Sequence, residues 1–431
     1  MANSGNRHLK GLVSVSPLIV FLVTYVVTSL VAKDFYKVPL AAAFILASAY
    51  GLFITPGGRI QDRIAIFSSG AGEKNVLLMI WIFVLAGAFA STAKDIGAID
   101  ATVALTLRIL PERWLFAGLF VASCFISMAI GTSVGTIVAL VPIAAGIASS
   151  SGQSVPFMTA IVVGGAFFGD NLSFISDTTV AATKTQGCSM RDKFRANIAV
   201  ALPSALIVAV IYFILGSSSA PVYDYAAGSA PLWKLLPYLT VIVLALAGMD
   251  VTAVLGIGIV LNGILGISSG AYGWVGWMSS IGGGISGMGE LIIVTLLAGG
   301  LLALIRRNGG MDYIFSILSG RIRGRRGAEF GIAGLVSLVN LCTANNTIAI
   351  LTAGPLARDI SDRYGLNPRR CASILDTFSC FVQGIIPYGA QLLMASGLSG
   401  VSAASIIPNL YYPFVLGIIA SLAIIMPYRN R

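Results

Sequence analysis

The sequence contains a single histidine, and its position excludes several kinds of chemistry. His8 lies in the N-terminal tail. A Ser-His-Asp triad or a histidine-based metal centre within the body of the chain is therefore excluded, because both need an imidazole at the site. Residues 131–135 read Gly-x-Ser-x-Gly and residues 282–287 read Gly-x-Gly-x-x-Gly, but neither run follows a strand in an α/β unit. We therefore predict that the protein is not an enzyme and needs no cofactor.

Cysteine is also scarce. The chain has five cysteines and no Cys-x-x-Cys pair. They are Cys124, Cys188, Cys342, Cys371 and Cys380. Because Cys124, Cys342 and Cys380 lie in apolar surroundings, the pattern favours thiols that pack in the interior over a metal site or a disulfide framework.

Charged residues make up only 10% of the chain, against about 25% in ordinary soluble domains, whereas 57% of the residues are hydrophobic. Apolar runs long enough for a bilayer recur throughout, for example at 11–32, 75–93, 196–216 and 290–305. The formal charge of +10 comes from short basic clusters between these runs. Such clusters indicate membrane topology and lipid phosphate as the partner, and not nucleic acid. The sequence thus predicts an all-α polytopic membrane protein.

The second half of the chain also matches the first half when the two are laid over each other. Residues 86–87 fall on 298–299, and residues 97–100 fall on 309–312. Collinear matches of this kind, at one constant offset, predict an internal duplication.

The predicted first repeat covers residues 9–216 and the second covers 233–431. The joining segment, 217–232, contains no Lys or Arg and is expected outside the cell, because basic loops mark the cytoplasmic side. The basic residues expected inside are Arg59, Arg63, Lys74, Lys184, Arg191, Lys193, Arg195, Arg306, Arg307, Arg321, Arg323, Arg325, Arg326, Arg358, Arg363, Arg369 and Arg370. Both termini are then cytoplasmic, in a multi-pass protein of the inner (plasma) membrane.

Two segments are expected to enter the membrane and return on the same side. Both flanks of residues 328–357 lie inside, so this segment forms a re-entrant helical hairpin with its tip at 343–347. Residues 114–150 form the equivalent hairpin from outside, with its tip at 131–136. Each repeat then has about five transmembrane helices plus one hairpin, and the second repeat is inverted relative to the first. Many secondary transporters are built in this way, with the site at the bilayer midplane.

Two acids lie in an otherwise apolar stretch of the first repeat. Residues 169–179 read Gly-Asp-Asn-Leu-Ser-Phe-Ile-Ser-Asp-Thr-Thr, which places Asp170 and Asp177 among hydroxyls and an amide. An acid at the centre of a membrane helix costs about 2.5 to 3.5 kcal/mol, so such residues usually face a cavity, an ion or a proton path.

Hydroxyl, amide and carboxylate oxygens near the two tips suit a hard cation such as sodium. The candidate ion- or substrate-binding residues are Asp170, Asn171, Ser173, Ser176, Asp177, Thr178, Thr132, Ser133, Thr136, Thr343, Asn345, Asn346, Thr347, Asp376 and Gln383. Asp170 and Asp177 are the candidate sodium ligands. Glu290 opens a helix and is either a cap or a proton carrier.

Each assignment has a structural alternative. The hydroxyls of the first tip are equally typical of close helix packing around Gly131 and Gly135. Asp170 and Asp177 would also suit a helix cap or an interfacial position, and Asp376 lies close enough in sequence to Arg369 and Arg370 to sit at the cytoplasmic interface.

The segment 169–179 resembles the Gly-Asp-x-x-Ser-Pro-x-Ser-Asp-Thr-Thr signature of the NhaC-type sodium/proton antiporter family, and the Gly-Thr-Ser run at 131–133 is similar too. This family belongs to a large superfamily of inverted-repeat ion transporters, and some members move organic acids or amino acids. Two departures matter. Phe174 replaces the usual proline, and the second tip, 343–346, lacks the acid of many members and is similar to the tips of carboxylate transporters.

The leading hypothesis is a secondary transporter that exchanges sodium ions for protons. Two acids in a poorly solvated cavity cannot both stay ionised without a counter-cation, so Asp170 and Asp177 would alternate between cation and proton. The alternative is a sodium- or proton-coupled transporter or exchanger of a small organic solute, whose carboxylate Asn345 and Asn346 would hold. A channel and a membrane-embedded enzyme are disfavoured. Stoichiometry, direction and a homodimeric state are left open.

Overall fold

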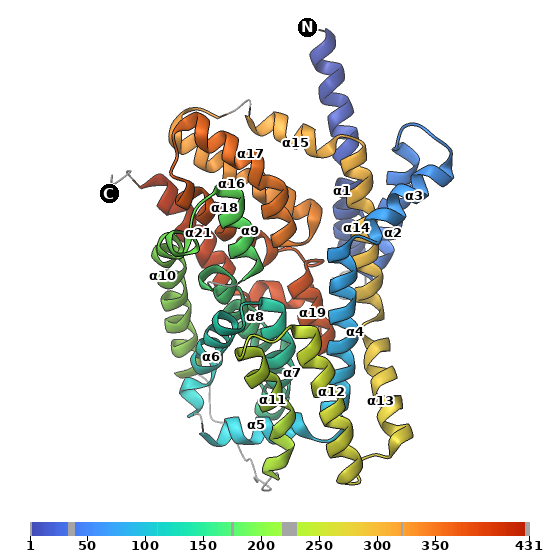
Figure 1. Ribbon diagram of the computed structural model, residues 1–431, viewed down its shortest axis with the longest axis vertical. Coiled ribbons are helices and arrows are strands. Elements are labelled where there is room, and N and C mark those ends of the chain that lie inside the picture. Colours follow the sequence, from blue (N-terminus) through green and yellow to red (C-terminus); the bar gives the residue numbers. More distant parts are fainter. Residues whose placement is uncertain are drawn as a thin grey trace.

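The computed structural model describes residues 2–32, 39–109, 111–173, 176–217, 231–319 and 322–426, and all regular structure in these residues is helical (Figure 1). The prediction of an all-α protein is confirmed. The helices are α1 (Ala2–Val31), α2 (Leu40–Ile54), α3 (Ile60–Ala71), α4 (Lys74–Asp95), α5 (Ala98–Ile109), η1 (Glu112–Trp114), α6 (Leu115–Ile130), α7 (Ser133–Ser151), α8 (Val155–Leu172), α9 (Asp177–Gln186), α10 (Met190–Ser217), η2 (Leu232–Leu235), α11 (Leu236–Leu246), α12 (Val251–Ser268), α13 (Trp274–Gly287), α14 (Gly289–Arg307), α15 (Gly310–Ser319), α16 (Gly324–Thr343), α17 (Asn346–Tyr364), α18 (Pro368–Gln383), α19 (Ala390–Ser399), α20 (Ala403–Ile406), η3 (Ile407–Asn409) and α21 (Tyr411–Ile425). Most of the predicted joining segment, and Phe174 and Arg321, lie outside the described residues.

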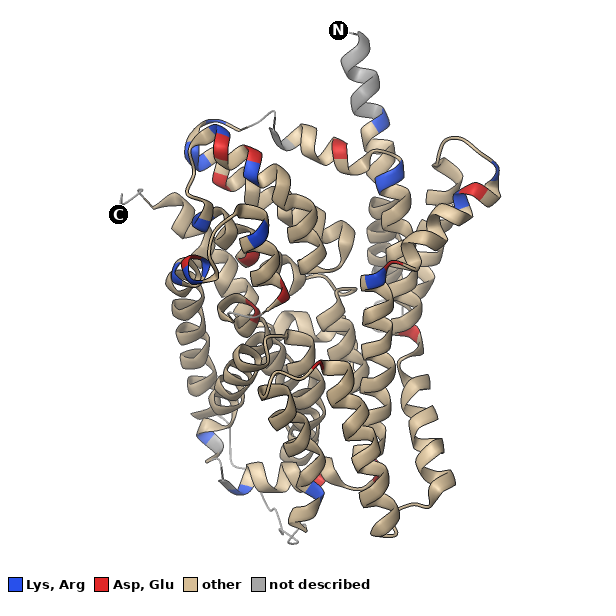
Figure 2. Ribbon diagram, viewed as in Figure 1, with Lys and Arg blue, Asp and Glu red and all other residues tan. Residues whose placement is uncertain are grey.

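Seven helices in the described part of the chain are long and apolar enough to cross a membrane, or up to eight if the bent pair formed by α19 and the α20–η3 segment counts as one span. Large apolar side chains cover their outer faces. Leu206 on α10 is 59% exposed and Ile264 on α12 is 61% exposed, which suits lipid and not water. Lys and Arg gather at the upper end of the view in Figure 2, with fewer at the lower end, and the band between them contains a few Asp and Glu but almost no Lys or Arg. The protein is a multi-pass membrane protein.

The helices form two groups that stand side by side (Figure 1). In the first helix group, defined as α1–α4 with α12–α14, α4 packs against α12 and α13, while α14 packs against α2 and α3. In the second helix group, defined as α6–α10 with α16–α19 and α21, α6 and α7 pack against α8, and α16 and α17 pack against α18. Helices α5 and α15 lie across opposite ends of the molecule.

Two helix crossings in the first helix group depend on glycine. A Cβ atom on Gly87 of α4 would lie 2.3 Å from the carbonyl oxygen of Gly284 on α13. A Cβ atom on Gly70 of α3 would lie 2.5 Å from the carbonyl oxygen of Gly299 on α14. Small residues let membrane helices approach this closely, so both crossings bring backbone against backbone.

Four helices of the second helix group end in the interior of the molecule. The break between α6 and α7 lies at Gly131 and Thr132, and the break between α16 and α17 lies at Ala344 and Asn345, inside the two predicted tips. Helices α8 and α18 also end in the interior. Helix α9 begins a few residues after the end of α8, and α19 begins a few residues after the end of α18. The starts of α7, α8 and α9 recur in the second half of the chain, at one constant offset, as the starts of α17, α18 and α19.

Candidate functional site

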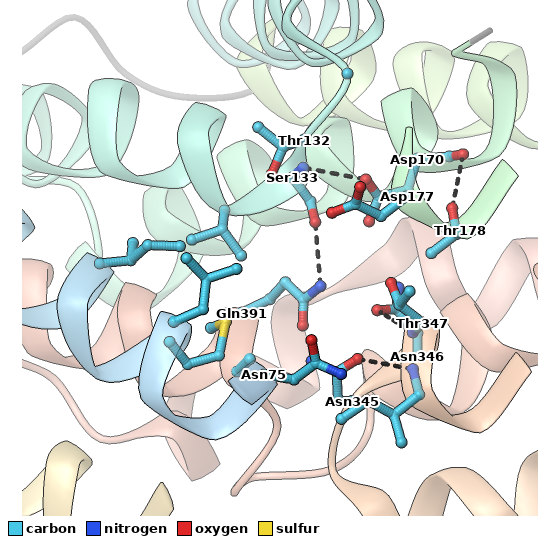
Figure 3. A pocket seen from close by; sticks show the side chains of 17 residues that line it. Asn75, Thr132, Ser133, Asp170, Asp177, Thr178, Asn345, Asn346, Thr347 and Gln391 are labelled. Carbon is cyan, nitrogen blue, oxygen red and sulfur yellow. Dashed lines mark hydrogen bonds between the residues drawn. The ribbon is translucent and has the colours of Figure 1, made fainter. Parts of the chain in front are cut away.

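A cavity of about 110 Å³ lies where these interrupted helices meet (Figure 3). Eight of the predicted site residues line it, and they come from the two tips and from the α8–α9 break. They are Thr132, Ser133, Asp170, Asp177, Thr178, Asn345, Asn346 and Thr347. The structure therefore brings together residues that are far apart in sequence.

Asp170 is the innermost acid of the cavity. It lies in the last turn of α8, is 4% exposed, and its Oδ1 accepts a hydrogen bond of 3.0 Å from the backbone N–H of Ser133. Ser133 is the first residue of α7, and a helix N-terminus favours a negative charge in front of it. The carbonyl of Asp170 accepts the hydroxyls of Ser176 at 2.9 Å and Thr178 at 3.2 Å, which replace the helical partner lost at the break.

Asp177 is the first residue of α9 and is more exposed than Asp170. Figure 3 shows the two aspartates together beside Thr132 and Ser133, with Asn345 and Asn346 on the opposite side of the cavity. None of the described residues that line the cavity is Lys or Arg. The site is therefore acidic on one side and uncharged on the other.

The asparagines of the second tip cap helix α17. Oδ1 of Asn345 accepts the N–H of Ile348, and Oδ1 of Asn346 accepts the N–H of Thr347, each at 3.0 Å. A backbone N–H needs an oxygen acceptor, which fixes the orientation of both amides. Their side-chain oxygens are thus used within the tip, and the donors are the amide N–H groups. Nδ2 of Asn346 also donates to Sγ of Cys380 at 3.9 Å.

Two lining residues were missed by the sequence reasoning, Asn75 of α4 and Gln391 of α19. Nε2 of Gln391 donates to Oγ of Ser133 at 3.1 Å, while its Oε1 accepts from Gln383 at 2.8 Å. Gln383 also donates to the carbonyl of Ala344 at 2.9 Å. We call Gln383 and Gln391 the glutamine bridge, because together they connect the first tip to the second.

The internal repeat was a usable signal for this bridge. With the helix starts of the two halves superposed, Gln383 stands in the second half where Asp170 stands in the first, and Gln391 stands where Thr178 does. Asn75 offered no comparable signal, because it directly follows a charged pair at the start of an apolar run.

The structure does not bring the other predicted residues to the cavity wall. Asn171, Ser173 and Ser176 build the α8–α9 break, Gln383 belongs to the glutamine bridge, and Thr343 lines a separate cavity of about 40 Å³. Thr136 donates back to the carbonyl of Thr132 at 3.1 Å, in line with the packing alternative. Glu290 lies near the start of α14 in another cavity of about 350 Å³, with Tyr25 and Ser396.

Asp376 and Lys193 form an ion pair behind the cavity. Asp376 on α18 is fully buried, and its Oδ2 lies 2.9 Å from Nζ of Lys193 and 2.6 Å from Nδ2 of Asn197. The prediction that Lys193 is a cytoplasmic loop residue is wrong, because Lys193 lies on α10 with 0% exposure. A lysine so placed needs an acidic partner, and nothing in the sequence near Lys193 indicates a partner as distant along the chain as Asp376.

The multi-pass helical fold and the acid-lined cavity fit a membrane transport protein, and the comparison with known families gives its class as secondary antiport. The chain belongs to the Na⁺/H⁺ antiporter family, whose model matches residues 9–217 and 219–429. The resemblance to NhaC-type antiporters is thereby confirmed.

Three relatives show the range of this similarity. The chain is 26% identical to the Na⁺/H⁺ antiporter NhaC of Bacillus subtilis strain 168, over 89% of this chain and 91% of that protein. It is 24% identical to a malate-2H⁺/Na⁺-lactate antiporter of the same organism, over 84% of this chain and 83% of the relative. It is also 24% identical to the arginine/ornithine antiporter ArcD of Halobacterium salinarum, over 83% of this chain and 78% of that protein.

Proposed function

We propose that the protein exchanges sodium ions for protons across the plasma membrane, with Asp170 and Asp177 as the alternating sites. The observation that carries this proposal is the burial of Asp170 in a cavity whose described lining contains no basic side chain. A buried carboxylate without a basic partner needs either a metal cation or a proton. Because both cannot occupy it at once, binding of one releases the other, and this competition couples the two fluxes.

The remaining groups of the cavity support a small cation as the cargo. Asp177 and the hydroxyls of Thr132, Ser133 and Thr178 add oxygen atoms on the side of Asp170. The cavity volume, about 110 Å³, suits an ion with a few waters. It is well below the range of about 300–1,000 Å³ that is usual for small-molecule sites.

The proposed mechanism includes two inverted repeats, with boundaries at 9–216, 217–232 and 233–431. The recurrence of helix starts at a constant offset and the two glycine crossings support it. The family model also matches in two segments, which meet inside the joining loop. In Figure 1, α16 and α17 occupy the upper half of the molecule and α6 and α7 the lower half, as hairpins entering from opposite sides would.

The upper end of Figure 2, where Lys and Arg gather, would be cytoplasmic. Both α1 and α21 have their outer ends there, so both chain termini would be inside the cell. Movement of one helix group against the other would then expose the cavity to each side in turn.

Transport by the purified protein in liposomes, with the sodium and proton gradients set independently, tests this function. We expect an imposed pH gradient to drive sodium uphill in the wild type, Asp170→Asn to abolish this flux, and Asp177→Asn to lose the coupling while remaining folded. Asp312→Asn, on the exposed face of α15, is the matched control and should behave as wild type. Sodium flux that ignores the pH gradient would show that the exchange proposal is wrong.

A second candidate function is sodium-coupled exchange of a small organic acid or amino acid. The observation that favours it is the donor character of the second tip, where the side-chain oxygens of Asn345 and Asn346 are used as caps and their amide N–H groups suit a carboxylate. Two of the relatives are antiporters of organic solutes. The absence of a basic residue from the described lining means that bound sodium would have to supply the counter-charge.

Thermal unfolding in detergent distinguishes the two functions. If an organic solute is the cargo, sodium raises the unfolding temperature and malate, lactate or arginine raises it further. Asn345→Ala should then remove the effect of the solute and leave the effect of sodium. For plain sodium/proton exchange, none of these solutes adds to the effect of sodium.

A further inference from the structure

The ammonium group of Lys193 is surrounded by oxygen atoms in the interior of the second helix group. Its Nζ donates to the backbone carbonyl of Asn171 at 2.8 Å and to Oγ1 of Thr179 at 2.7 Å. Its third contact is Oδ2 of Asp376 at 2.9 Å. An ammonium group has three N–H donors, so each of them has an oxygen partner and none is left over.

These three oxygens are also the ligand types that a hard monovalent cation takes. One is a carbonyl freed by the end of α8, one is the hydroxyl of Thr179 in the first turn of α9, and one is a carboxylate on α18. The arrangement is built and rigid, because Nδ2 of Asn197 holds both the Asn171 carbonyl at 2.8 Å and Oδ2 of Asp376 at 2.6 Å. No described residue donates to the other carboxylate oxygen, Oδ1 of Asp376.

The pair lies directly behind the candidate cavity. Thr178 lines the cavity, and the next residue, Thr179, contacts Lys193. Asp170 lines the cavity, and the carbonyl of the next residue, Asn171, contacts Lys193 as well. The two sites therefore share one stretch of interrupted backbone.

Lys193 reduces the net negative charge of the buried region. Asp170 and Asp376 are both buried acids, and the ammonium offsets one of them. One buried negative charge remains for a mobile cation or proton, at Asp170, beside the exposed Asp177 at the same cavity. Without the ammonium, two buried acids would each need a cation.

We propose that Lys193 is a tethered cation that fills a second cation site made by Asn171, Thr179 and Asp376, and that it thereby restricts mobile sodium to the cavity at Asp170. This inference rests on the proposed function, because it takes the cavity to be a sodium site. It makes Asp376 the counter-ion of Lys193 and not a ligand of the transported ion. Lys193 thus sets how many cations move in one cycle.

Counting bound sodium tests the proposal. Equilibrium binding of radioactive sodium to the purified full chain in detergent should give one more sodium ion per chain for Lys193→Met than for wild type. In the double variant Lys193→Met/Asp376→Asn, which removes both charges, the number should return to that of the wild type. Lys184→Met, at an exposed position on α9, is the matched control and should leave the number unchanged.

Each other outcome is decisive. If Lys193→Met is folded but binds no additional sodium, the pair is only structural and the proposal is wrong. If Lys193→Met is unstable, its unfolding temperature should rise with sodium chloride and not with N-methyl-D-glucamine chloride. The proposal is also wrong if Lys193→Met is unstable and sodium does not stabilise it, while the double variant Lys193→Met/Asp376→Asn is folded. A wild type that binds no sodium contradicts the proposed function instead, while the comparison among the variants still tests the tethered cation.

Discussion

At the scale of single residues, the two tips turn with the same backbone geometry but different side chains. Gly131 has φ of 77° and Ala344 has φ of 53°, and both end a helix in the left-handed region. A residue with a Cβ costs about 1–2 kcal/mol in this region, whereas glycine is free to adopt it. The second tip therefore carries strain that the first does not.

Exchanging these residues should have opposite effects. We expect Ala344→Gly to raise the free energy of unfolding by up to about 1 kcal/mol, because relief of strain exceeds the greater freedom of glycine in the unfolded chain. Gly131→Ala should lower it by about 1–2 kcal/mol. Unfolding by denaturant in detergent measures both changes, and a stabilising effect of Gly131→Ala would contradict this account.

The glutamine bridge makes a second prediction at this scale. Gln391→Ala leaves the Nε2 of Gln383 without one of its acceptors and the Ser133 hydroxyl without its donor. Loss of such buried hydrogen bonds costs about 1–2 kcal/mol, which corresponds to sodium binding about 5- to 30-fold weaker if the tips must be held together to bind the ion. Sodium titration measures the change, with Gln61→Ala on the exposed face of α3 as the control. Unchanged sodium affinity would mean that the bridge has no part in binding.

At the scale of helices and loops, the sequence predicted where helices are interrupted better than it predicted which side chains contact each other. Runs of Gly, Ser, Thr and Asn between apolar stretches predicted an interruption at each tip, and a helix does end and another begin at both. Interrupted membrane helices need residues that satisfy or tolerate free backbone. The same reasoning picked Asp170 and Asp177, which the structure does place together. Lys193 was misassigned, because a lysine near the start of a helix looks the same whether it faces cytoplasm or a buried carboxylate.

The close glycine crossing between α4 and α13 predicts how substitutions on α13 change the stability of the protein. A Cβ atom on Gly284 would lie 2.2 Å from the carbonyl of Gly87, whereas a Cβ atom on Gly283 would meet nothing within 4 Å. Gly284→Ala should therefore lower the free energy of unfolding by about 1–3 kcal/mol, since backbone cannot move aside easily. Gly283→Ala is the matched control and should raise it by about 0.5–1 kcal/mol through helix propensity. Equal effects at the two positions would argue against the close crossing.

At the scale of the whole molecule, the orientation in the membrane is open to a direct test. Four of the five cysteines are buried, so replacing the partly exposed Cys188 by Ser gives a background for single labels. In intact cells, Ser269→Cys, between α12 and α13, should react with an impermeant maleimide. Arg326→Cys, at the start of α16, should react only after the membrane is opened. The reverse pattern would invert the proposed topology.

One wall of the cavity differs from the others. Among the described lining residues, only Asn75, Leu78, Met79 and Ile82 come from the first helix group, and all four lie on α4. In the proposed movement of one helix group against the other, every lining residue except those on α4 would move together, and α4 would present one amide, Asn75, and three apolar side chains. An ion bound to Asp170 would then keep most of its oxygen ligands during the movement. If the groups do move in this way, we expect the turnover rate to fall as the viscosity of the lipid rises, because each cycle then requires movement along α4.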